Sequence, residues 1–190
     1  WVCSITGNSI DQALKNAENF SLSLNNISTA PYFLPYMSGE RTPHNDPHVR
    51  GSFHYLKTTT NQAALQYAVL EGISFGILDG VNSIKSVNKN FNDIFMVGGG
   101  SRSSFWLRLL SSILNRKLSV CEQSEFGAAL GVARLAMFVD KDISQKNNII
   151  KEINIKESFQ SDNDKIDILQ KRYIVWKNIY SSNKKISTDF

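Results

Sequence analysis

The sequence predicts an α/β fold, in which helices pack against the faces of a sheet. Two observations support this prediction. Strand-length apolar segments alternate with helical periodicity over residues 94–138, and a run of glycines joins the first of these strands to its helix. Strands and helices that alternate at this spacing are typical of α/β layers. The chain has 190 residues, of which 42% are hydrophobic, so it is long enough to bury a core.

The charges and cysteines argue against several classes of function. The net charge is +4, but the excess consists mainly of lysines scattered among acids beyond residue 140, whereas a nucleic-acid footprint needs a clustered stripe. No apolar run approaches the length of a membrane span, so neither nucleic acid nor membrane is expected as a partner. Cys3 and Cys121 are far apart and form no CxxC motif, which favours reduced thiols in a cytoplasmic protein over a disulfide framework or a zinc site.

The N-terminal part is predicted to form two short helices and a strand. A break at residues 7–9 separates the helices, and either Ser9 or Asp11 is expected to cap the second one. Asn25 and Asn26 are typical of a turn. The short apolar run over residues 31–34 indicates a strand.

A polar loop is predicted over residues 36–51, which hold two prolines and two of the three histidines. Loops of this length inside compact domains are often functional. We expect its own turns and ion pairs to order it, with Glu40 and Arg41 able to pair; contact with a cleft or with another subunit is the alternative. The spacing of the histidines does not favour a metal site at His44, His48 and His54.

The clearest helix is predicted over residues 63–85. Its glycines recur at i, i+4 and i+8, and three glycines on one helix face indicate that another backbone approaches closely at Gly72, Gly76 and Gly80. Glu71 has core-facing neighbours and is interpreted as a buried, hydrogen-bonded acid. The remaining strands are expected at residues 52–56, 94–97 and 117–121, and the remaining helices at residues 103–114, 125–138 and 164–180.

The segment before the final helix has a weaker secondary-structure pattern than the rest of the chain. Residues 140–157 are polar with no strong period. The final helix should place one apolar stripe on the core, made of Ile168, Leu169, Tyr173, Trp176, Ile179 and Tyr180. Trp106 is likewise interpreted as a core residue.

The glycine run at Gly98, Gly99 and Gly100 offers a mechanism for binding a ligand. Glycines have no Cβ, so a ligand can lie directly on the backbone, and the helix that follows presents unpaired N–H groups. Ser101 or Ser103 should cap that helix or bond the ligand. The Gly-Lys-Ser/Thr ending of a Walker loop is missing, and a tight turn without a ligand explains the glycines equally well.

Four stretches together resemble the FGGY carbohydrate kinase family, and within it the xylulose kinases. They are FLPYMSGERTPHNDP at residues 33–47, AVLEG at 68–72, VGGGSRSSFW at 97–106 and GAALGVAR at 127–134. All four occur in the family's order with the family's spacing. The resemblance departs from the family at Tyr55, where a glycine is usual, and at Ala64, where an acid or amide is usual.

The resemblance implies a ribonuclease H-like fold, the fold of the ATPases actin, Hsp70 and hexokinase. It identifies residues 1–140 as the core of the kinase C-terminal domain and residues 141–190 as an extension that ends in a helix of the same domain. It also implies that the chain lacks the first strands of that domain and the whole N-terminal domain. We therefore expect a fragment that is marginally stable and inactive alone.

The implied reaction transfers the γ-phosphate of ATP to D-xylulose, with ATP and Mg²⁺ as cofactors. Carried over by motif, Gly98, Gly99 and Gly100 would hold the adenosine and Ser103 would reach the adenine; no residue of this chain matches the family's catalytic base or a metal ligand. The implied partners are ATP, a small sugar and the N-terminal domain of the same enzyme, and a homodimer stays open. The alternatives are an FGGY kinase for gluconate, glycerol or another sugar, and a stand-alone, non-catalytic adenosine-binding module.

Overall fold

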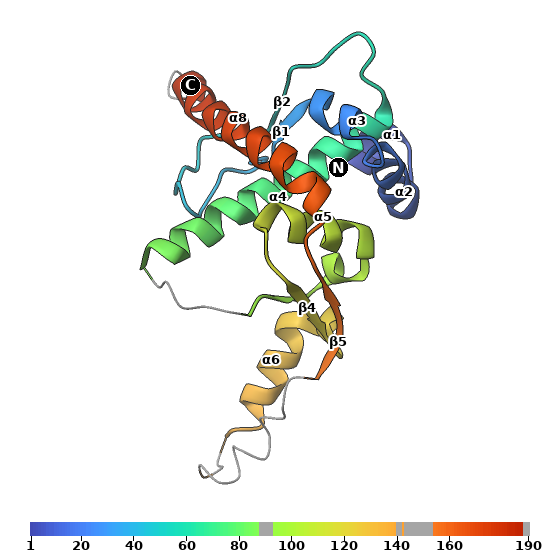
Figure 1. Ribbon diagram of the computed structural model, residues 1–190. Coiled ribbons are helices and arrows are strands. Elements are labelled where there is room, and N and C mark those ends of the chain that lie inside the picture. The colour runs from blue at the N-terminus through green and yellow to red at the C-terminus, as the bar shows by residue number, and fades with distance from the viewer. Residues whose placement is uncertain (88–92, 140–141, 143–153, 188–190) are drawn as a thin grey trace.

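The computed structural model describes residues 1–87, 93–139, 142 and 154–187 and has a mixed α/β architecture, as predicted (Figure 1). Its helices are α1 Val2–Thr6, α2 Ile10–Phe20, α3 Leu24–Thr29, α4 Gln62–Val87, α5 Ser104–Leu114, α6 Gly127–Ala136 and α8 Asn163–Ser187, with the 3₁₀ turns η1 Gly99–Arg102 and η2 Ser124–Phe126. Its strands are β1 Tyr32–Leu34, β2 Ser52–His54, β3 Phe95–Met96, β4 Leu118–Cys121 and β5 Ile155–Phe159.

The strands form two small sheets. β1 and β2 pair antiparallel, with Phe33 opposite Phe53. The second sheet has the order β3-β4-β5, in which β3 runs parallel to β4 and β5 antiparallel to it. Parallel pairing of β3 with β4 is what a strand–helix–strand unit requires, since α5 carries the chain back across the sheet.

The N-terminal caps follow the prediction at one point and contradict it at another. Ser9 caps α2 by accepting a hydrogen bond from the Gln12 N–H at 3.2 Å. The expected turn at Asn25 and Asn26 is wrong, because both residues lie inside α3. The burial of Ile27, which is fully enclosed, outweighs the local turn preference of the asparagines.

Helix α4 lies at the centre of the fold and packs against α2, β1 and α5. The predicted close approach is confirmed at Gly72, where a Cβ would overlap the carbonyl oxygen of Phe33. At Gly76 a Cβ would only touch Pro35, at 3.8 Å, and at Gly80 it would meet open space. The glycine face is therefore a close backbone contact at one end only.

Helix α8 crosses α4 and buries the predicted stripe, with Ile168 half-buried at its edge. The Trp176 indole N–H donates to the Phe33 carbonyl at 2.8 Å, which ties α8 to β1. Figure 1 shows α8, in red, crossing α4 with its first turns beside α5. Residues far apart in the sequence thus share one core.

A buried ion pair joins α8 to α4. Arg172 approaches both oxygens of Glu71, at 2.7 and 2.6 Å, and donates to the carbonyls of Ala30 and Pro31 at 3.1 Å. The Tyr67 hydroxyl donates to Glu71 at 3.2 Å. Glu71 is therefore the buried, hydrogen-bonded acid that the sequence predicts, and its partner is Arg172.

Strand β5 begins at Ile155, within the polar stretch in which the sequence shows no strong period. Only Phe159 of its five residues is buried, so no alternating pattern marks the strand. Pairing with β4, not burial, holds it in place. Residues 140–141 and 143–153 lie outside the described residues.

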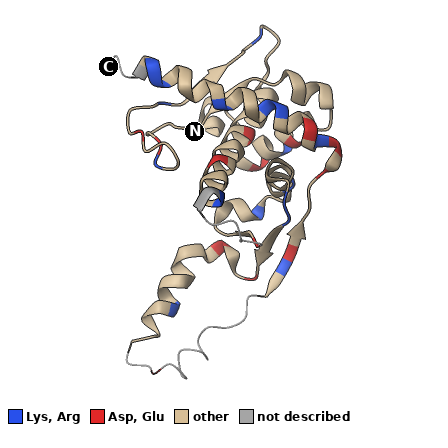
Figure 2. Cartoon of the chain, turned by 60° about the vertical axis from the view of Figure 1, so that its left-hand side comes forward, with Lys and Arg blue, Asp and Glu red and all other residues tan. Residues whose placement is uncertain are grey.

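Helix α6 and strand β3 expose apolar surface. None of the residues of α6 is buried, and Figures 1 and 2 both show this helix projecting away from the body. Val132 and Leu135 of α6 are 65% and 64% exposed, and Val97 beside β3 is 58% exposed. Figure 2 shows that Lys, Arg, Asp and Glu residues are spread over several elements. No helix in the described ranges is long and apolar enough to span a membrane.

Candidate functional site

The glycine run forms a turn between β3 and α5, as predicted, with one added element. Gly98 has φ +84°, a conformation that favours glycine, and the chain then makes the 3₁₀ turn η1 before Ser103 begins the approach to α5. The sequence predicts that the helix begins at about residue 103 and does not predict the 3₁₀ turn over Gly99–Arg102.

The inner side of the turn is fixed by two serines. The Gly98 N–H donates to the Ser124 carbonyl at 2.8 Å, and the Ser101 hydroxyl donates to the Gly98 carbonyl at 2.7 Å. The hydroxyls of Ser101 and Ser124 lie 3.2 Å apart, and both side chains are buried. Ser101 thus holds the turn together from within.

The outer side of the turn is open at two of its three glycines. A Cβ built on Gly98 or on Gly99 would meet no atom within 4 Å. A Cβ on Gly100 would overlap the ring of Trp106. Gly98 and Gly99 therefore present bare backbone to a ligand, whereas Gly100 also has a packing reason to be glycine.

Ser103 caps α5. Its Oγ accepts a hydrogen bond from the Trp106 N–H at 3.2 Å, which satisfies one of the unpaired donors of the first turn. The cap uses an acceptor lone pair, so the Ser103 hydroxyl proton stays available to donate. Contact between Ser103 and adenine stays a prediction.

Trp106 reaches from α5 to α4. Its indole N–H donates to the Ser74 hydroxyl at 2.9 Å, and Ser74, which is fully buried, donates in turn to the Leu70 carbonyl at 2.7 Å. The sequence predicts a core role for Trp106 but not this contact with the glycine turn. The pairing of Gly100 with an aromatic residue six positions later is the signal that could have indicated it.

The polar loop over residues 36–51 is ordered mainly by carboxylates that bind backbone. Glu40 accepts from the His44 N–H at 2.8 Å. The favoured pairing of Glu40 with Arg41 is not among the ion pairs of the described residues. Asp46 accepts from the backbone N–H groups of His48 and Val49 and from the Tyr180 hydroxyl. Burial tends to raise the pKa of Asp46, but these hydrogen bonds lower it below its usual value.

His44 of the loop contacts the body of the protein, whereas His54 contacts a residue of its own strand. The His44 ring stacks on Tyr180, and its Nε2 lies 3.6 Å from a carboxylate oxygen of Asp79. His54 Nε2 lies 2.7 Å from the Ser52 hydroxyl, and burial lowers the pKa of His54. Over the described ranges, no three His, Cys, Asp or Glu side chains are grouped so that they could hold a metal.

Both departures from the family pattern have a structural counterpart. Tyr55 keeps a backbone φ of +60°, the region that favours glycine, and packs its ring edge-to-face on Tyr32. The Ala64 N–H donates to the side-chain oxygen of Asn61 at 2.9 Å, at the start of α4. The tyrosine is 70% exposed, so the ring itself causes no clash.

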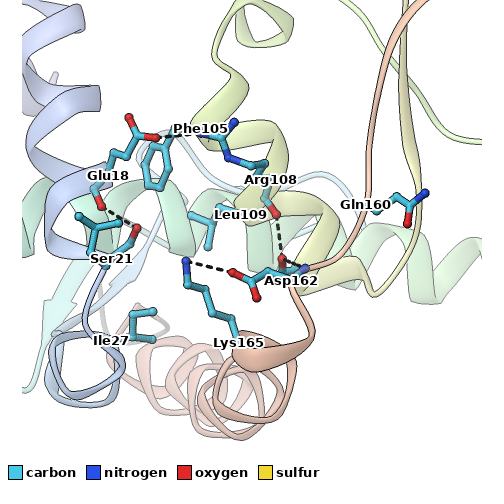
Figure 3. Close-up of a pocket in the computed structure, with 11 residues that line it drawn as sticks. Glu18, Ser21, Ile27, Phe105, Arg108, Leu109, Gln160, Asp162 and Lys165 are labelled. Atoms are coloured by element: carbon cyan, nitrogen blue, oxygen red, sulfur yellow. Dashed lines mark hydrogen bonds and ion pairs between the residues drawn. The ribbon is translucent and has the colours of Figure 1, made fainter.

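A cavity of about 230 Å³ lies apart from the glycine turn (Figure 3). It opens between α2, α5 and the start of α8, over an apolar floor that includes Ile27 and Leu109. Its charged side chains are paired: Arg108 of α5 lies 2.8 Å from Glu18 of α2, and Lys165 lies 3.2 Å from Asp162, three residues earlier in the chain. None of Gly98, Gly99, Gly100 and Ser103 lines it.

The fold is that of the sugar kinases with an actin- and hexokinase-like ATPase architecture. A solved kinase from Brucella ovis, described as a xyloylose kinase, superposes with a TM-score of 0.81 at 31% sequence identity over 98% of this chain and 37% of that one. Residues 1–139 match the FGGY family of carbohydrate kinases, C-terminal domain, and the chain belongs to this family.

Curated relatives carry the name xylulose kinase. The Staphylococcus epidermidis protein is 32% identical over 158 residues, which cover 83% of this chain and 32% of the relative. The Escherichia coli K12 protein is 30% identical over 181 residues, which cover 95% of this chain and 37% of the relative. The chain thus spans about a third of the length of the curated relatives it matches.

Proposed function

We propose that this chain supplies the adenosine-binding surface of a sugar kinase that transfers the γ-phosphate of ATP to D-xylulose. The open backbone of Gly98 and Gly99, held at the end of β3, is the observation that carries the proposal. The names of the curated relatives support D-xylulose as the acceptor.

In this proposal the adenosine lies on the backbone of Gly98 and Gly99, and the Ser103 hydroxyl donates to the adenine. The turn has no lysine, so it holds the nucleoside end and leaves the phosphates to other parts of the enzyme. Mg²⁺ bound to the ATP phosphates would neutralise the charge that develops during phosphoryl transfer. We assign neither the catalytic base nor a metal ligand to this chain.

We further propose that residues 1–140 and 141–190 belong to one C-terminal domain that lacks its first strands. Among the described residues, β3 is an edge strand and no residue of α6 is buried. Both observations support this proposal, because a parallel strand pair is normally part of a sheet that helices cover on both faces. The N-terminal domain of a longer kinase would then supply the sugar site and the base. The chain alone, in the cytoplasm or in a test tube, is not expected to phosphorylate a sugar.

Titration calorimetry with ADP tests the adenosine assignment. Gly99→Val should weaken ADP binding about tenfold or more, because the branched side chain fills the space above the turn. Gly80→Val is the matched control, since a Cβ there also meets open space but lies on α4. Equal ADP affinity in Gly99→Val and the unaltered chain would rule the assignment out.

A substrate panel tests the acceptor. The complete kinase that contains this chain should phosphorylate D-xylulose with a higher kcat/KM than D-gluconate or glycerol, because sugar kinases discriminate through differential transition-state binding. If the kinase prefers gluconate or glycerol, that compound and not D-xylulose is the acceptor. This result would not affect the adenosine assignment.

A further inference from the structure

We propose that Trp106 is a positioning residue that sets the shape of the glycine turn for adenosine binding. The inference rests on the proposed function, because it names the side chain on which the same site depends. Trp106 does not face the open surface above Gly98 and Gly99; it lies behind Gly100. Its role is therefore to hold the backbone that the ligand contacts.

Trp106 touches three separate parts of the site. Its ring lies where a Cβ of Gly100 would be, its backbone N–H donates to the Ser103 Oγ, and its indole N–H donates to Ser74 of α4. Ser74 is fully buried and is itself held by the Leu70 carbonyl. Trp106 thus connects the turn to the most central helix of the fold.

The two sides of the turn are anchored by different means. Ser124 and Ser101 fix the side toward η2 through hydrogen bonds to Gly98. On the side toward α4, the Trp106 ring packs on Gly100 and is itself fixed by Ser74. A turn that is fixed on both sides loses little conformational freedom on binding, and this preorganisation strengthens affinity. Without the contact between Trp106 and Ser74, part of the binding free energy would be used to order η1, and the affinity for the ligand would fall.

ADP affinity measured by calorimetry provides the first test. Trp106→Phe and Ser74→Ala should each weaken ADP binding about three- to tenfold, the range for one lost hydrogen bond. The double variant should be no weaker than Trp106→Phe, because both changes remove the same bond. Additive losses would show that the two residues act independently and would overturn the inference.

Trp176→Phe is the matched control for a structural effect. Trp176 also donates a buried indole hydrogen bond, to the Phe33 carbonyl, but it lies on α8 outside the turn. This variant should lower the urea midpoint while leaving the ADP affinity unchanged. A loss of ADP affinity as large in Trp176→Phe as in Trp106→Phe would show that general destabilisation explains the result.

Amide hydrogen exchange tests the positioning role without a nucleotide. The Ser101 N–H donates to the Gly98 carbonyl and the Ser103 N–H to the Gly100 carbonyl, so both report on the turn. Their exchange should accelerate about tenfold in Ser74→Ala relative to Trp176→Phe. Equal rates would contradict the inference. If the unaltered chain binds no ADP, the adenosine function fails, and exchange at these two amides alone decides the role of Trp106.

Discussion

Charged side chains in this chain hold backbone groups, both nearby in the sequence and in distant segments. Asp46 orders its loop by accepting backbone hydrogen bonds, and Arg172 holds the carbonyls of Ala30 and Pro31 while pairing with Glu71. Burial of the Glu71–Arg172 pair makes a single truncation costly, because the charge left behind has no partner. The Asp46 contacts are local, whereas Arg172 binds residues more than 100 positions away, which the local sequence does not indicate.

The lowered pKa of Asp46 predicts an acid-sensitive loop. Because the pKa is lower in the folded chain than the usual value of 3.8, Asp46 stabilises the fold above that value and loses this contribution as the pH falls through its folded pKa. Urea unfolding should therefore show Asp46→Asn to be destabilised at pH 7, with a gap to the unaltered chain that narrows below about pH 4. In a Tyr180→Phe background, Asp46→Asn should still lower the free energy of unfolding at pH 7, but by less than in the unaltered chain, because one of the hydrogen bonds to Asp46 is already missing. A gap that is constant from pH 7 to pH 3 would contradict the explanation.

At the scale of elements, the sequence predicts helices and strands well where burial is strong. The stripe from Leu169 to Tyr180 and the apolar run before Gly98 both mark elements that the structure contains. The sequence does not predict the elements that depend on tertiary contacts. Helix α3 forms around the asparagines because Ile27 is buried, and β5 forms by pairing with β4. In the site, the positions of Gly98 and Ser103 follow from the sequence, but the contact of Trp106 with Ser74 joins residues 32 positions apart and carries no local signal.

Replacing glycine by alanine should have opposite effects on stability at two positions of the glycine face of α4. Gly72→Ala should destabilise the chain by about 1–3 kcal/mol, because the new Cβ would overlap the Phe33 carbonyl oxygen. Gly80→Ala should stabilise it by about 0.5–1 kcal/mol, because alanine is the better helix former and the space is open. The unfolding free energies of the two variants, measured in urea, should therefore move in opposite directions. Equal shifts would mean that the close contact with β1 is not formed in solution.

On the scale of the whole molecule, one end is well packed and the other is open. The core joins α2, α4, α5 and α8, whereas β3 and α6 expose apolar surface at the end of the glycine turn. The chain spans about a third of its curated relatives, and we propose that the exposed end meets the remainder of such an enzyme. The FGGY family is established by residues 1–139, and the adenosine site at the turn is the central proposal.

Amide chemical shifts during a titration with ADP test that central proposal most directly. The largest shifts should occur at Gly98, Gly99 and Ser103, because these residues lie on or beside the open surface. Residues that line the separate cavity, such as Arg108 and Lys165, should shift little. Saturable shifts concentrated at the turn would agree with the proposal. Shifts concentrated at the cavity, or none at saturating ADP, would contradict it.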